Sequence, residues 1–222
     1  MTTGHASVPV GPAVLVIAKA PVPGRVKTRL VPPCTPEQAA ELAEAALADT
    51  LDAVAASGLA ARRVLVLDGT PGSWLPDGFG VIPQRGIGLA ARLAAAFEDA
   101  GGPAFLVGMD TPQLTPALLD AGLAALASAD AAFGPALDGG YWGIGLRRAD
   151  PAAFRGVPMS ADDTGAVQRA RLAELELCTT VLPALRDVDT IADACAVAAE
   201  APGTRFAAVL AQIDEIAQER AA

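Results

Sequence analysis

The apolar run Ala13-Val14-Leu15-Val16-Ile17-Ala18, with the loop Lys19-Ala20-Pro21-Val22-Pro23-Gly24-Arg25-Val26-Lys27-Thr28-Arg29-Leu30 directly after it, decides the fold. An uninterrupted apolar run of this length predicts a strand that is buried on both faces. Such strands belong to parallel sheets covered by helices, and ligands bind these sheets at the carboxyl ends of the strands. The loop that follows is therefore the first place to look for a binding site.

The rest of the chain alternates short apolar runs with longer alanine-rich amphipathic stretches. We expect further strands at residues 64–67, 80–83, 104–108, 131–134, 141–146 and 178–182. Helices are expected at about 35–57, 89–100 and 164–175, from 115 onward and again after 190. Thr35 with Gln38, and Thr190 with Asp193, have the spacing of helix capping boxes, while Thr164 is expected to cap its helix.

This alternation predicts βαβ units and a mostly parallel sheet with helices on both faces, which is an α/β fold. No linker, repeat or low-complexity tract divides the sequence. We expect one domain over residues 12–222, preceded by a loose N-terminal tail at 1–11.

Composition excludes several classes of function. The chain of 222 residues is 52% hydrophobic, which predicts a folded domain, and its net charge of −9 disfavours nucleic-acid binding. Cys34, Cys178 and Cys195 are too far apart for a zinc ribbon or a disulfide framework and favour a cytoplasmic location. His5 is the only histidine, so a Ser-His-Asp triad is excluded. Neither an export signal nor a membrane span is apparent, and the oligomeric state is left open.

The loop 19–29 is a local positive island in this acidic chain. It holds four of the 16 basic residues, including both lysines. Glycine permits backbone conformations that aim N–H groups at an anion, and lysine and arginine donate to phosphate oxygens. We interpret the loop as a phosphate cradle, the alternative being a solvated basic loop; it lacks the Walker A pattern. The candidate phosphate-binding residues are Lys19, Gly24, Arg25, Lys27, Thr28 and Arg29.

An acid follows the expected strand at 104–108, within Gly108-Met109-Asp110-Thr111-Pro112. A carboxylate at the end of a central strand is well placed to hold Mg²⁺ or Mn²⁺ against a diphosphate. The alternative is that Asp110 only turns the chain before Pro112.

The stretch Gly134-Pro135-Ala136-Leu137-Asp138-Gly139-Gly140-Tyr141-Trp142-Gly143 combines glycines with the only tyrosine of the chain. Glycines allow a ligand to approach the backbone, and aromatic rings offer a stacking face. The alternative is a hairpin bend with its aromatic residues in the core. The candidate acceptor-binding residues are Asp138, Gly139, Gly140, Tyr141 and Trp142.

Two further loops carry weaker signals. Gln84 and Gly86, after the expected third strand, are candidates for contact with a nucleobase or phosphate, although a plain tight loop fits equally well. Asp187 and Asp189 point to the same side of an extended segment, where the two carboxylates either repel each other or share a cation. The alternative is that Asp189 belongs to the helix-cap region with Thr190. Asp162-Asp163-Thr164 is interpreted as a simple helix start.

Together these motifs resemble the bacterial selenodomain-associated transferase family, whose members include glycosyltransferases assigned to arsenosugar biosynthesis. The resemblance covers about residues 13–200. It is carried by Lys19-x-Pro21-x-Pro23-Gly24-x-x-Lys27-Thr28-Arg29-Leu30, Gly108-Met109-Asp110-Thr111-Pro112, Gly134-Pro135-Ala136-x-Asp138-Gly139-Gly140-Tyr141 and Asp187-Val188-Asp189-Thr190.

The resemblance implies a nucleotide-diphosphosugar transferase (GT-A, Rossmann-like) fold. It also implies kinship with the guanylyltransferases of molybdenum-cofactor and deazaflavin-cofactor synthesis and with CMP-sugar synthetases. Carried over to this sequence, Lys27 and Arg29 would contact nucleotide phosphates, Asp110 would hold the divalent metal, and Asp189 would be a second metal carboxylate. The chain has Leu89-Ala90-Ala91-Arg92 where its relatives carry an acid, and a stiffer first loop than nucleotidyltransferases have.

These inferences predict a metal-dependent transferase that uses a nucleotide-activated donor and a small-molecule acceptor. The first hypothesis is glycosyl transfer, with Asp110, Asp138 and Lys27 as catalytic candidates and Asp110, Asp187 and Asp189 as metal ligands. Asp138 is the candidate base because the loops offer no histidine. The second hypothesis is guanylyltransferase-like nucleotidyl transfer, from a nucleoside triphosphate to a phosphorylated small molecule with release of pyrophosphate. The third is a nucleotide-binding protein without catalysis, motivated by the missing acid near Ala91.

Overall fold

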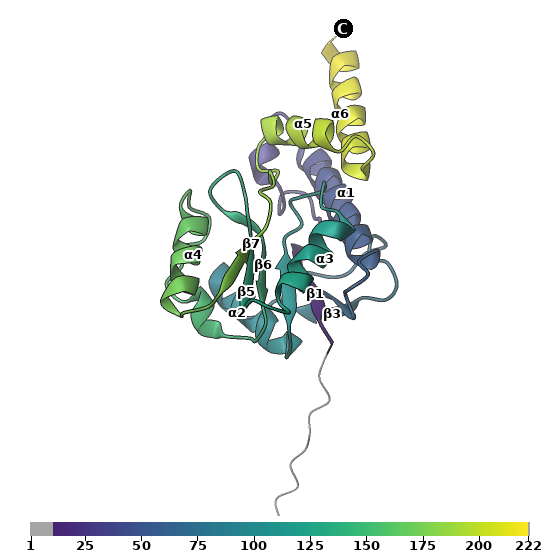
Figure 1. The fold of residues 1–222 in the computed structure, drawn as a ribbon. Coiled ribbons are helices and arrows are strands. Elements are labelled where there is room, and N and C mark those ends of the chain that lie inside the picture. The colour runs from purple at the N-terminus through teal and green to yellow at the C-terminus, as the bar shows by residue number, and fades with distance from the viewer. Residues whose placement is uncertain (1–10, 222) are drawn as a thin grey trace, which may run out of the picture.

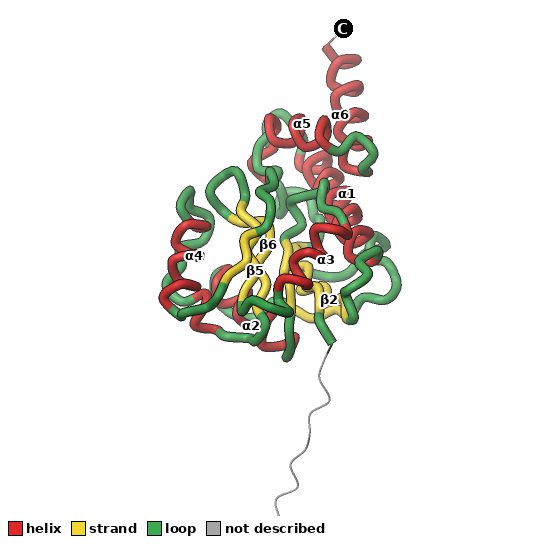
Figure 2. Tube along the Cα trace, in the orientation of Figure 1, coloured by secondary structure: helices red, strands yellow, loops and turns green. Residues whose placement is uncertain are grey.

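The computed structural model describes residues 11–221, and side chains as far as Ile213. Apart from Gly11, the expected N-terminal tail lies outside the described residues. The described chain forms one seven-stranded sheet with helices on both faces (Figures 1 and 2), so the predicted α/β class is confirmed. Its helices include none that is both long and apolar enough to cross a bilayer.

The sheet has the strand order β3-β2-β1-β4-β6-β5-β7. All neighbouring strands run parallel except at β6, which is antiparallel to both β4 and β5. The sheet is therefore mostly parallel, as the alternating pattern predicts. The strand bounds are β1 Ala13–Lys19, β2 Arg62–Asp68, β3 Gly80–Pro83, β4 Ala104–Val107, β5 Ala131–Pro135, β6 Tyr141–Leu146 and β7 Thr179–Val181.

The helices begin close to the predicted residues. The capping boxes at Thr35 and Thr190 are both formed, each with its side chain accepting from the third helical N–H. Asp163, not Thr164, is the residue before its helix, so the predicted cap at Thr164 is wrong. The helix bounds are α1 Pro36–Ala55, α2 Leu89–Ala100, α3 Pro116–Ala125, α4 Thr164–Glu174, α5 Ile191–Glu200 and α6 Arg205–Ala221, with short 3-10 turns η1 Thr28–Leu30 and η2 Pro151–Phe154.

Two apolar layers cover the sheet. Helices α1 and α3 pack on one face through residues such as Leu47, Leu51 and Leu119. The opposite face is covered by α2, η2 and α4, with Phe97 and Phe154 stacked at 5.6 Å between ring centroids. Burying apolar side chains on both faces explains why β1 and β4 read as continuous hydrophobic runs.

Helices α5 and α6 lie beyond α1, away from the sheet (Figure 1). They bury a third apolar cluster against the outer side of α1, which includes Leu42, Ala46, Val197 and Phe206. The second buried face of α1 explains its many alanines, because small side chains let helices approach closely. The chain entering α5 also brings residues 187–189 to the edge of the sheet.

Candidate active site

A cavity of about 940 Å³ lies at the carboxyl ends of the parallel strands. It extends across the point where β2 and β3 lie on one side of β1 and β4 lies on the other, which is the topological switch point of the sheet. On the side of β1 and β2, its walls are the loop after β1 and the start of α2. The other walls are the residues after β4, the β5–β6 connection, the segment before α4 and the residues after β7. Most of the sequence-predicted site residues line this cavity, but Gly24, Gly86 and Gly139 do not.

Lys27 joins the basic loop to the residues after β4. Its side chain is only 8% exposed, and its ammonium contacts the carboxylate of Asp110 and donates to the carbonyl oxygen of Val188. The backbone of Lys27 is left-handed, with φ of 46°, directly before the 3-10 turn at Thr28–Leu30. This turn directs the lysine inward, while the buried Leu30 anchors the loop in the core.

The other residues of the predicted phosphate cradle lie around Lys27. Lys19, Arg25, Thr28 and Arg29 all line the cavity. Gly24 does not line it; with φ of 74° it permits the turn that carries the loop back toward the sheet. Glycine is thus needed there for backbone conformation.

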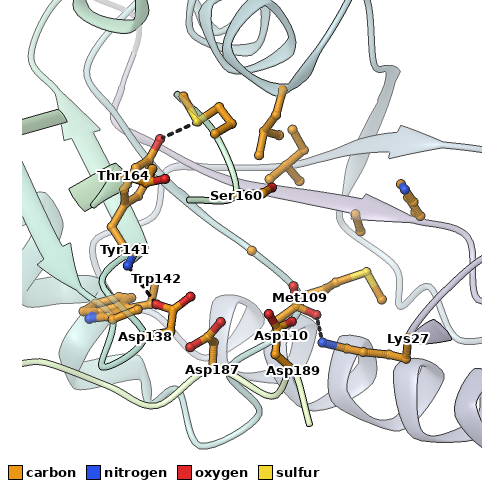
Figure 3. A pocket seen from close by; sticks show the side chains of 18 of the residues that line it. Lys27, Met109, Asp110, Asp138, Tyr141, Trp142, Ser160, Thr164, Asp187 and Asp189 are labelled. Atoms are coloured by element: carbon orange, nitrogen blue, oxygen red, sulfur yellow. Dashed lines mark hydrogen bonds and ion pairs between the residues drawn. The ribbon is translucent and has the colours of Figure 1, made fainter. Parts of the chain in front are cut away.

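Three carboxylates from two distant loops form a cluster. One oxygen from each of Asp138, Asp187 and Asp189 lies within 4.8 Å of the others. The N–H of Val188 donates to the carbonyl oxygen of Asp110 at 2.9 Å, and this bond holds the segment after β7 beside the residue after β4. Figure 3 shows Asp138, Asp187, the pair Asp110 and Asp189, and Lys27 in succession along the cavity.

The crowding of these carboxylates affects Asp187 most. Burial, then the negative charge of Asp138, and more weakly those of Asp189 and Asp110, raise the pKa of Asp187 to about 6. Burial and like charge both disfavour the ionised carboxylate, and a cation placed among the oxygens would oppose both effects.

Arg29 forms a second link between the basic loop and the acidic cluster. Its guanidinium Nη1 lies 2.5 Å from Oδ2 of Asp189, although the arginine side chain is 67% exposed. Lys27 and Arg29 are therefore both paired with carboxylates that were predicted to hold a metal. An exposed pair of this kind exchanges partners at low cost.

The aromatic residues of the β5–β6 connection are mostly used within the protein. The Trp142 side chain is buried against Phe105, and its indole N–H donates to the carbonyl of Pro183 at 2.9 Å. Tyr141 lies beside Phe133 and donates to the sulfur of Met159 at 3.8 Å, and burial raises its pKa. Both residues contribute atoms to the cavity wall, but neither ring is free.

The region after β3 contains a polar network that the sequence did not reveal. Gln84 donates to the carbonyls of Ala18 and Val66, at 2.8 and 3.2 Å, and its amide oxygen accepts from Arg92. Arg92 also contacts Asp68 at 3.2 Å and lines the cavity together with Gln84. The only sequence signal was that Arg92 lies one helical turn after the glycine that begins α2.

Gly86 lies outside the cavity wall. It has φ of 106°, and an added Cβ would lie 2.9 Å from that of Ala91. Glycine at this position allows the loop to turn tightly into α2.

The segment before α4, residues 158–164, forms a wall that sequence reasoning interpreted only as a helix start. Met159, Ser160, Ala161 and Asp162 all line the cavity. This wall meets the β5–β6 connection backbone to backbone: a Cβ on Gly139 would lie 1.9 Å from the carbonyl oxygen of Asp162. Gly139 thus permits the contact between two loops and does not itself line the cavity, whereas Gly140 does.

The chain belongs to the DUF2064 family, described as an uncharacterized protein conserved in bacteria, whose sequence pattern matches residues 40–161. The match covers more than half of the sequence and includes Asp110 and Asp138. No curated protein matches the chain significantly.

Solved structures extend the comparison. A protein from Desulfovibrio desulfuricans G20, named as a candidate nucleotide-diphospho-sugar transferase, is 27% identical with a TM-score of 0.82, over 94% of this chain and 97% of that one. A CMP:2-keto-3-deoxy-manno-octonic acid synthetase solved with CTP is 12% identical with a TM-score of 0.56, over 85% and 97% of the two chains. The 4-diphosphocytidyl-2C-methyl-D-erythritol synthase of Anaerococcus prevotii DSM 20548 is 10% identical with a TM-score of 0.54, over 86% and 96%.

The last two similarities establish the fold alone, whereas the first extends over nearly the whole of both chains. All three support the predicted nucleotide-diphosphosugar transferase fold. The comparisons are consistent with an enzyme of the transferase class, and the cavity lies where ligands bind in sheets of this topology.

Proposed function

We propose that this protein is a divalent-metal-dependent transferase that moves a glycosyl group from a nucleotide-activated donor to a small-molecule acceptor. The observation that carries the proposal is the charge distribution in one cavity. Among the described residues, every basic side chain that lines the cavity comes from the end of β1, the loop after it or α2, and every acidic one comes from a segment that follows β4 in the chain. A donor diphosphate needs basic side chains, and the divalent cation that binds it needs carboxylates close by. The expected resemblance to selenodomain-associated glycosyltransferases agrees with this proposal.

The residues present fit a divalent metal. Asp187 and Asp189 offer neighbouring carboxylate oxygens, and Asp110, the other predicted ligand, lines the same cavity. Carboxylate oxygens are the donors that Mg²⁺ and Mn²⁺ prefer. Burial and, after it, the neighbouring negative charges raise the pKa of Asp187, and a cation beside its carboxylate would oppose both effects. When bound, the metal would supply positive charge to the leaving diphosphate.

The basic loop would bind and orient the donor. Lys27 and Arg29 would donate to diphosphate oxygens, while Arg25 and Lys19 add positive charge around them. Because Lys27 and Arg29 start paired with Asp110 and Asp189, binding exchanges one set of negative oxygens for another. These side chains would then stabilise charge as it develops on the diphosphate.

Asp138 is the proposed base. The N–H of Gly140 donates to its Oδ1 at 2.8 Å and fixes the carboxylate, whose other oxygen remains to accept the proton of an acceptor hydroxyl. In the transfer, a bond forms between the acceptor oxygen and the anomeric carbon. The bond from that carbon to the diphosphate oxygen breaks, and the diphosphate leaves with the electron pair.

Nucleotidyl transfer is the second candidate. Lys19, Arg25, Lys27 and Arg29 all line the cavity, and four basic side chains would suit a triphosphate as well as a diphosphate. The acceptor oxygen would then bond to the α-phosphorus, and pyrophosphate would leave. Release of pyrophosphate from a nucleoside triphosphate would favour this reaction, whereas loss of the sugar from a nucleotide sugar would favour glycosyl transfer.

A thermal-shift screen of nucleoside triphosphates and nucleotide sugars, with and without Mg²⁺, tests the proposal. A ligand that binds only the folded state raises the melting temperature by mass action. We expect stabilisation by nucleotide sugars that depends on the metal, and loss of both metal-dependent binding and turnover in Asp110→Ala. Retention of both in that variant would refute the role of Asp110. Nucleotide binding without turnover on any acceptor would instead identify a non-catalytic binding protein.

A further inference from the structure

The acidic half of the cavity bears on the identity of the acceptor. We call the part of the cavity lined by Asp110, Asp138, Asp162, Asp187, Asp189 and Asp193 its acidic half; among the basic side chains that line the cavity, Lys27 and Arg29 are the ones with an ion pair to these acids within the described residues. Asp110 and Asp189 are paired with Lys27 and Arg29, and Asp193 with Arg186. Asp138, Asp162 and Asp187 have no such ion-pair partner within the described part of the chain.

Asp162 differs from the clustered carboxylates. It is exposed, and the wall that carries it is fixed by two close backbone approaches. The N–H of Gly165 donates to the carbonyl of Gly139 at 2.7 Å, and a Cβ on Gly165 would lie 2.5 Å from the carbonyl oxygen of Gly140. These contacts hold the segment that carries Asp162 against the loop that carries Asp138, the proposed base.

This geometry points to an acceptor without phosphate or carboxylate. We propose, on the basis of the function proposed above, that the acceptor is a polyhydroxylated molecule that is neutral or carries an amine. A single divalent cation cannot neutralise all the unpaired carboxylates of this half, so an anionic group beside Asp138 and Asp162 would meet repulsion without a compensating donor. Hydroxyl groups, in contrast, can donate to these oxygens.

The alternative is a phosphorylated acceptor. Its phosphate would need basic side chains close to the acceptor position. Lys27 and Arg29, which contact the acidic half through Asp110 and Asp189, would be occupied by the donor phosphates in the proposed complex. The separation of basic and acidic side chains therefore disfavours binding of an anionic acceptor and so contributes to acceptor specificity.

Ligand-observed NMR with glucose and glucose 6-phosphate tests this inference, since the two probes share a ring and differ by one phosphate. The protein would carry Mg²⁺ and the nucleoside diphosphate that stabilises it most. We expect glucose to bind up to about fivefold more tightly than glucose 6-phosphate, since fivefold is the upper end of the effect of one exposed charge pair. Glucosamine should bind at least as well as glucose.

Asp162→Lys should remove this discrimination or reverse it, and Asp162→Asn should reduce it. Asp163→Lys is the matched control, because Asp163 is exposed, lies outside the cavity wall and makes no side-chain cap hydrogen bond. Equal or tighter binding of glucose 6-phosphate, failure of both sugars to bind the nucleotide-loaded protein, or an equal effect of the two lysine variants would overturn the inference. Failure of every nucleotide to bind would instead overturn the proposed function.

Discussion

The two halves of the sheet present opposite charges to one cavity. The half made of β3, β2 and β1 contributes its cations mainly through one continuous loop, whereas the half made of β4, β6, β5 and β7 contributes carboxylates from separate segments. The difference suggests a division of labour, with an anionic donor held on the first half and a cation with the acceptor on the second. Lys27 and Arg29 cross the boundary and neutralise the opposite half.

The largest effect should follow removal of a carboxylate from the acidic cluster. Asp189→Asn should weaken Mn²⁺ binding by about 100-fold or more, since the loss of even an outer-shell partner of a metal ligand costs 10–100-fold. Electron paramagnetic resonance titration measures the free Mn²⁺. Asp163→Asn, beside the cavity but outside its wall, is the control. Equal Mn²⁺ affinities in the two variants would contradict the proposal that the acidic half of the cavity binds the metal.

The next largest effect should come from the basic half. Lys27→Met should lower the affinity for a nucleoside diphosphate by about tenfold or more, because hydrogen bonds to charged groups contribute about 1.5–3 kcal/mol. Isothermal titration calorimetry measures this affinity. Arg169→Gln, on α4 away from the cavity, should leave it unchanged. An unchanged affinity in Lys27→Met would contradict the phosphate cradle.

Crowding of the acidic half should reduce the stability of the metal-free protein. The raised pKa of Asp187 means that its ionised form is disfavoured in the folded state, so this cost is present above pH of about 6 and disappears as Asp187 becomes protonated at lower pH. Asp187→Asn should therefore raise the melting temperature near neutral pH by about 2–4 °C, the shift expected for ~1 kcal/mol in a chain of this size.

That gain should shrink toward zero at about pH 4, where Asp187 is protonated in the folded wild type and the two proteins carry the same charge at this position. Scanning calorimetry in the presence of a chelator gives both values. A variant that is less stable than the wild type at neutral pH would show that Asp187 is not under repulsion.

The smallest effect should come from breaking the ion pair between Arg29 and Asp189, which joins the two halves of the cavity. Arg29→Gln should raise Mn²⁺ affinity in the absence of nucleotide by roughly threefold, since an exposed ion pair is typically worth 0.2–1 kcal/mol and its cation competes with the metal for Asp189. The same variant should bind a nucleoside diphosphate more weakly. If the affinities for Mn²⁺ and for the nucleoside diphosphate changed in the same direction, Arg29 would not be exchanging Asp189 for the diphosphate.

Local features of the chain could be predicted from the sequence, whereas contacts between distant segments could not. The apolar run 13–18, the capping boxes and the island at 19–29 are local features, so periodicity and spacing were sufficient to find them. By contrast, the antiparallel insertion of β6 between β4 and β5 depends on long-range strand pairing. Such pairing carries no local signal.

Close approaches between distant loops were also invisible in the sequence. The contact of Gly139 with the backbone of Asp162 brings the wall before α4 to the cavity, and the grouping of Asp138 with Asp187 requires the strand order to be known. Trp142 illustrates the reverse case, because an aromatic residue beside glycines suggests stacking with a ligand, yet its ring is buried in the core.

The central claim is that one cavity holds a diphosphate on its cationic half and a divalent metal on its anionic half, in contact with each other. Crystallography of the protein with Mn²⁺ and a nucleoside diphosphate, using the anomalous signal of manganese, tests it most directly. The account predicts an anomalous peak among the carboxylates of Asp187, Asp189 and their neighbours, with the diphosphate between it and Lys27. A manganese ion or a diphosphate bound outside this cavity would contradict the claim.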